Sequence, residues 1–175
     1  MIYIITGATH TGKTKLAQTL LETYHIPYLS LDHLKMGLIR SKQTSLTPQD
    51  DALLVDYLWP IIKEIIKTAI ENKQDLIIEG CYIPFTWKQD FDQNYQTDIR
   101  YIALVMSEAY IKQQFQIIQS HANIIEQRFT DELSMQTLIE DNRYYLEGCQ
   151  TYHLPYRYIH DHYDLEHPTL EDLFD

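Results

Sequence analysis

The sequence predicts an α/β domain in which a five-stranded parallel sheet carries helices on both of its faces. Short apolar runs alternate with segments of helical periodicity along the chain, which is typical of this fold class. The apolar runs are nearly continuous, as expected of parallel strands that are covered on both sides. The length of 175 residues is that of one domain. We therefore expect residues 1–175 to form a single domain.

The five expected strands are 2–6, 25–31, 75–80, 99–105 and 156–160. A first helix should carry Leu16, Leu20 and Leu21, which have helical spacing. A second helix is expected from Thr47–Pro48 to about Asn72, with a kink or break at Pro60. Three further helices are expected: from about 108 to 120 after a Ser107 cap, from about 134 to 151, and after His167–Pro168.

The composition excludes several classes of protein. A hydrophobic content of 45% argues against a disordered chain, and a net charge of -11 argues against nucleic acid as the default partner. No apolar run reaches the roughly 18 residues of a membrane helix, and residues 1–6 are too short for a signal peptide. Cys81 and Cys149 form no disulfide framework. We expect a cytoplasmic protein with reduced thiols and no membrane partner, either a monomer or a homodimer.

The strongest functional signal is the segment Gly7-Ala8-Thr9-His10-Thr11-Gly12-Lys13-Thr14. It matches the phosphate-binding pattern G-x-x-x-x-G-K-[ST] and lies between an expected strand and an expected helix, as that motif requires. Successive backbone amides and the helix N-terminus then bind phosphate oxygens. Lys13 adds a charge for the terminal phosphates, and the Thr14 hydroxyl is a ligand for Mg²⁺. The sequence therefore predicts a site for a nucleoside triphosphate and Mg²⁺ within a three-layer P-loop NTPase fold, and the resemblance described next favours ATP.

On this motif and on the order of its elements, the chain resembles the small-molecule P-loop kinases of the adenylate-kinase-like group. That group includes shikimate and gluconate kinases, chloramphenicol phosphotransferase and zeta toxins. The resemblance implies that Asp32, just past the second expected strand, orients and deprotonates the acceptor hydroxyl. The alternative is that Asp32 caps a helix starting at His33.

The resemblance also assigns a role to the carboxylate at the end of the third expected strand. Glu79 stands where P-loop enzymes place the acidic residue that reaches Mg²⁺ directly or through water. This chain has Glu where Asp is usual, so substrate binding by Glu79 stays open. A third alternative is a strand-end carboxylate that faces solvent.

The resemblance further implies a small lid, expected at about 121–143, that closes on ATP. Arg128 and Arg143 lie in this range and are candidates to neutralise charge on the transferring phosphoryl group. Either could instead be a solvated surface arginine.

Acceptor recognition is expected from an insert at about 33–60 and from the residues after Gly80. Lys35 and Arg40 are candidate anchors for an anionic acceptor, although Lys35 could be a surface charge. Tyr82, with Phe85 and Trp87, could wall an acceptor pocket, and packing at the core edge is the alternative.

Together these features predict an ATP-dependent, nucleotide-kinase-like enzyme that transfers the γ-phosphoryl group to a small-molecule acceptor. The alternative function is a nucleotide-binding regulatory module, or an ATPase without a small-molecule acceptor. The sequence leaves the identity of the acceptor open, as well as the choice between ATP and GTP.

Overall fold

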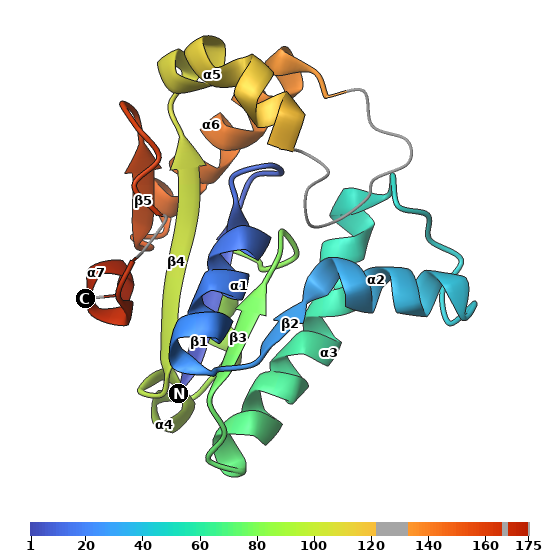
Figure 1. Cartoon of the computed structure of the whole chain (residues 1–175). Helices are drawn as coiled ribbons and strands as arrows, with labels where there is room; N and C mark the ends of the chain where they lie inside the picture. Colours follow the sequence, from blue (N-terminus) through green and yellow to red (C-terminus); the bar gives the residue numbers. More distant parts are fainter. Residues whose placement is uncertain (122–132, 166–167, 175) are drawn as a thin grey trace.

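The structure, a computed structural model, describes residues 1–121, 133–165 and 168–174 and contains one five-stranded sheet. The strand order is β2-β3-β1-β4-β5, and every neighbouring pair is parallel (Figure 1). The strands are β1 (Ile2–Gly7), β2 (Tyr28–Ser30), β3 (Leu76–Glu79), β4 (Ile99–Met106) and β5 (Tyr156–Ile159). The predicted fold class is therefore confirmed.

Helices connect the strands and cover the sheet. They are α1 (Lys13–Tyr24), α2 (Leu31–Arg40), α3 (Asp51–Glu71), the 3-10 turn η1 (Trp87–Asp90), α4 (Gln93–Gln96), α5 (Glu108–His121), α6 (Met135–Thr151) and α7 (Leu170–Phe174). Ser107 caps α5 as predicted, because its hydroxyl accepts from the Tyr110 amide at 3.0 Å. No helix within the described ranges is both long and apolar enough to cross a bilayer.

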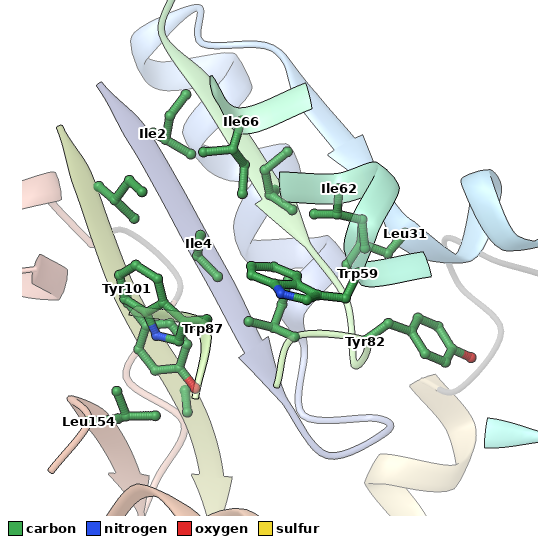
Figure 2. Packing of buried hydrophobic residues seen from close by; sticks show 14 of the residues in the cluster. Ile2, Ile4, Leu31, Trp59, Ile62, Ile66, Tyr82, Trp87, Tyr101 and Leu154 are labelled. Carbon is green, nitrogen blue, oxygen red and sulfur yellow. The ribbon is translucent and has the colours of Figure 1, made fainter. Parts of the chain in front are cut away.

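Two apolar clusters lie on opposite faces of the sheet, because alternate strand residues point to opposite sides. On one face, Ile2 and Ile4 of β1 pack with Trp59, Ile62 and Ile66 of α3 (Figure 2). On the other face, the central strands contribute residues that pack against α1, α5, α6 and α7; these include Ile5, Ile77, Ile102 and Leu104. This two-sided burial accounts for the continuous apolar runs in the sequence.

Some element boundaries differ from the sequence prediction. The strand β2 is shorter than the expected 25–31, and η1 and α4 were not expected. Helix α3 begins at Asp51 instead of Thr47, because the Thr47 amide and hydroxyl both donate to Asp50 Oδ2 at 2.7 Å and form a separate turn.

The expected break at Pro60 does not occur, and α3 runs through this residue. The face of α3 that meets the sheet includes the fully buried Leu54, Leu58, Ile62 and Ile66. Packing of this face outweighs the hydrogen bond that proline removes from the helix.

The register of the sheet places the predicted site residues along one edge. In the strand pairing, Glu79 stands opposite Ser30 of β2 and Ile5 of β1. The segments that follow β1, β2 and β3 therefore emerge side by side at the carboxyl edge, where ligands bind in open parallel sheets.

Candidate active site

The loop between β1 and α1 contains three residues with positive φ. Gly7 and Gly12 have φ values of 135° and 88°, and His10 has a φ of 63°. A Cβ atom at Gly7 would overlap the Leu104 carbonyl, and one at Gly12 would overlap the Tyr163 hydroxyl. These positions explain why the two fixed glycines of the motif are needed here. The curved backbone fits the role of an anion cradle.

Lys13 and Thr11 hold the loop together from within. The Lys13 ammonium donates to the Ala8 carbonyl at 2.7 Å, and the Thr11 hydroxyl donates to the same oxygen at 2.8 Å. Lys13 is only 6% exposed. Water therefore screens its charge weakly, and its interaction with a negative group in the loop is strengthened. An ammonium has three donors, so Lys13 can contact the loop and a phosphate oxygen together.

Thr14 and Glu79 bring two oxygen ligands together beside the loop. The Thr14 hydroxyl donates to Glu79 Oε2 at 3.2 Å, and Glu79 is 2% exposed. The buried position excludes the interpretation of Glu79 as a carboxylate in solvent. A hydroxyl and a carboxylate are the hard oxygen donors that Mg²⁺ prefers, so this pair fits a magnesium ion.

A close contact at Gly80 fixes Asp32 relative to Glu79. Gly80 has a φ of 151°, and a Cβ atom built on it would lie 2.7 Å from Leu31 Cβ. Leu31, which is fully buried, is the first residue of α2. Asp32 follows in the first turn, where the helix dipole favours a carboxylate. The N-cap of α2 is Ser30, so the alternative in which Asp32 caps a helix from His33 is wrong.

Asp32 belongs to a hydrogen-bonded cluster on the side of the site formed by α2 and α3. The Lys35 ammonium donates to Asp32 Oδ1 at 2.6 Å and to the Tyr82 hydroxyl at 2.7 Å. The Tyr82 hydroxyl in turn donates to Asp51 Oδ1 at 3.2 Å. We call Asp32, Lys35, Asp51 and Tyr82 the acceptor-side cluster.

Tyr82 joins this cluster to the core. Its ring is buried, and its hydroxyl points away from the labelled core residues (Figure 2). Burial, followed by the negative charges of Asp32 and Asp51, raises the pKa of Tyr82 well above its ordinary value. The phenol therefore stays protonated and remains a donor to Asp51. Phe85 and Trp87 have no contact with this cluster among the interactions of the described residues. Phe85 packs against Tyr144, Tyr145 and Tyr152, and Trp87 stacks on Tyr101.

Two residues that the sequence did not indicate lie beside the loop. Asp141 of α6 is close enough to Lys13 and Asp51 to feel both charges, and its pKa is raised by burial first and then by Asp51 and Glu140. The Tyr163 hydroxyl donates to the Thr11 carbonyl at 3.4 Å. Tyr163 follows β5, and the rule that ligand loops follow strands could have indicated this segment. No local pattern marks Asp141.

The arginine candidates that the structure describes, Arg143 and Arg40, are not gathered at the loop. Arg128 lies outside the described residues. Arg143 is 56% exposed and pairs with Glu108 of α5 at 3.2 Å. Two positions along a helix correspond to a rotation of about 200°, so Arg143 and Asp141 lie on different faces of α6. Arg40 is exposed at the last residue of α2, which projects away from the sheet (Figure 1).

Comparison with known proteins supports the fold. No protein-family model and no curated protein matches the sequence. A solved structure from Chloroflexus aurantiacus, described as a presumed kinase, has a TM-score of 0.57 and 19% identity, covering 94% of this chain and 91% of that one.

Two further solved structures have lower structural similarity. A shikimate kinase from Bacteroides thetaiotaomicron has a TM-score of 0.49 and 15% identity, covering 91% of this chain and 84% of that one. A gluconokinase from Sinorhizobium meliloti has a TM-score of 0.48 and 14% identity, covering 98% of this chain and 88% of that one. The sheet topology and the likeness to the Chloroflexus aurantiacus structure show that the two chains share one α/β fold with a parallel sheet.

Proposed function

We propose that this protein is an ATP-dependent kinase that transfers the γ-phosphoryl group to a hydroxyl of a small molecule. The observation that carries the proposal is the convergence of three structural features at one edge of the sheet. These are the loop with Lys13, the Thr14–Glu79 oxygen pair, and Asp32 at the start of α2. A nucleotide-binding module alone would not need a carboxylate held on the acceptor side.

The loop binds the donor. Its amides and the N-terminus of α1 face the β- and γ-phosphates of ATP, and the Lys13 ammonium contacts the terminal phosphate oxygens. Thr14 and Glu79 would hold Mg²⁺, which would supply electrostatic stabilisation to the phosphate oxygens.

The acceptor side supplies the base. Asp32 accepts the proton of the acceptor hydroxyl, whose oxygen forms a bond to the γ-phosphorus. The bond between that phosphorus and the bridging oxygen of ADP breaks, and ADP leaves with its negative charge next to Lys13. Arg128, in the expected lid, is our candidate for neutralising charge on the transferring group.

The test is ADP formation from Mg·ATP with and without a panel of hydroxylated small molecules. We expect strong dependence on an acceptor and a loss of kcat of about 10²- to 10⁴-fold in Asp32→Asn, the range of general-base catalysis. Asp56→Asn, an exposed carboxylate of α3, is the matched control and should keep wild-type turnover. ADP formation that no acceptor changes would favour the ATPase or regulatory alternative.

A further inference from the structure

The segment that follows β5 reaches back to the phosphate loop through Tyr163. The Tyr163 hydroxyl donates to the Thr11 carbonyl at 3.4 Å, and the two residues are 152 positions apart in the sequence. The hydroxyl lies on the side of Gly12 where a side chain would stand, because a Cβ atom built on Gly12 would overlap it. The glycine therefore serves two purposes here, since it allows a φ of 88° and leaves room for the tyrosine.

The neighbours of Tyr163 hold it in place. Asp164 pairs with Arg157 of β5 at 2.6 Å, and Leu165 is 1% exposed and belongs to the apolar cluster under α1. The Lys15 ammonium lies 5.8 Å from the centre of the Tyr163 ring, a cation–π distance. These contacts limit the movement of the segment, so the hydroxyl is presented to the loop from a fixed position.

The contact with Thr11 determines the orientation of an amide in the loop. The Thr11 carbonyl and the Gly12 N–H belong to one peptide group, which is planar and trans, so the two bonds point in opposite directions. The Gly12 N–H therefore points away from Tyr163. The Gly12 carbonyl accepts from the Leu16 amide at 2.9 Å, which fixes the Lys13 N–H in the same way. Two successive amides thus have fixed orientations, as an anion-binding nest requires.

We propose that Tyr163 is a positioning residue of the phosphate site, whose hydroxyl holds the Thr11–Gly12 peptide group so that the Gly12 amide faces the phosphates of the bound nucleotide. This inference rests on the proposed function, in which the loop binds a nucleoside triphosphate. An amide that is oriented before the ligand arrives loses less conformational freedom on binding. Tyr163 acts through the loop backbone, so its effect should be the same whatever group the phosphates carry.

The test compares Mg·ATP with inorganic tripolyphosphate, which has the phosphates without the nucleoside. Calorimetry measures the affinity for Mg·ATP directly and that for tripolyphosphate, also with Mg²⁺, by displacement of ATP. Tyr163→Phe removes the hydroxyl and keeps the ring. It should weaken the binding of both ligands by a similar factor of about 3- to 10-fold, the range of one hydrogen bond.

Tyr156→Phe is the matched control, since Tyr156 is an exposed residue at the opposite end of β5 from the segment that carries Tyr163. It should bind both ligands as the wild type does. Urea unfolding of each variant without ligand shows whether the fold is equally stable.

Unchanged affinity of Tyr163→Phe for both ligands, with or without a loss of stability to urea, would overturn the inference and leave the proposed function standing. Weaker binding of Mg·ATP with unchanged binding of tripolyphosphate would also overturn it, because the hydroxyl would then act on the nucleoside. A wild-type protein from which tripolyphosphate displaces no Mg·ATP would contradict the proposed function and this inference together.

Discussion

At the scale of single residues, Asp141 is a half-buried carboxyl group that the fold keeps in an unfavourable environment. Burial and the charge of Asp51 raise its pKa above the ordinary 3.8. The folded state therefore binds a proton to higher pH than the unfolded state, and this group costs stability as the pH rises above that value. We expect Asp141→Asn to unfold at higher urea concentration than the wild type at pH 7.

The same comparison near pH 3.5 should show a much smaller increase in stability, because the carboxyl group is then mostly protonated in both states. Glu147→Gln, an exposed carboxylate of the same helix, should have no effect at either pH. An equal increase in the stability of Asp141→Asn to urea at both pH values, or a decrease at pH 7, would contradict the raised pKa of Asp141.

At the residue scale, the sequence is most informative where the chemistry is local. The positions of the phosphate loop follow from one contiguous motif, because its glycines, lysine and threonine act within a single turn. Asp141 and Tyr163 were missed, because each reaches the loop only through the packing of distant elements. The partners of Lys35 were missed for a similar reason, since Tyr82 lies 47 positions away in the sequence.

At the scale of elements, the contact between the end of β3 and the start of α2 determines where Asp32 lies. Gly80→Ala places a Cβ atom against Leu31 at a backbone conformation that L-residues rarely adopt. We expect a loss of about 1–3 kcal/mol in the free energy of unfolding and reduced acceptor-dependent turnover, because Asp32 moves with Leu31.

Gly37→Ala offers a matched control, since an added Cβ at this position of α2 meets nothing within 4 Å. In an ordinary helical position this substitution should stabilise by about 0.5–1 kcal/mol and leave turnover unchanged. Chemical denaturation and ADP formation measure both effects. A Gly80→Ala variant as stable and active as the wild type would show that the contact does not position α2.

The position of Arg143 on α6 also leads to a prediction. Arg143 forms an exposed ion pair with Glu108, and such pairs contribute about 0–1 kcal/mol to the free energy of unfolding. We expect Arg143→Ala to change kcat by less than about threefold, whereas Arg128→Ala should lower it by about 10- to 1000-fold if Arg128 contacts the transferring group. Steady-state kinetics of the two variants show which arginine contributes to turnover. An equal loss of kcat in both variants would contradict the placement of Arg143 away from the loop.

At the scale of the whole molecule, alternation of apolar runs and helices was sufficient to predict the parallel sheet. The runs at Ile2–Gly7 and Ile99–Met106 are buried on both faces, so their hydrophobicity is visible without any knowledge of neighbours. Boundaries were less predictable, because they depend on tertiary contacts. The turn at Thr47–Asp50 and the unbroken helix through Pro60 are examples.

The central claim is that the turn between β1 and α1 binds the triphosphate of ATP, and calorimetric titration with Mg·ATP tests it most directly. We predict one binding site in the wild type and at least about 100-fold weaker binding in Lys13→Ala, whose fold is checked by circular dichroism. Lys112→Ala, which removes an exposed ion pair on α5, should bind as the wild type does. Unchanged affinity in a folded Lys13→Ala variant would contradict the account.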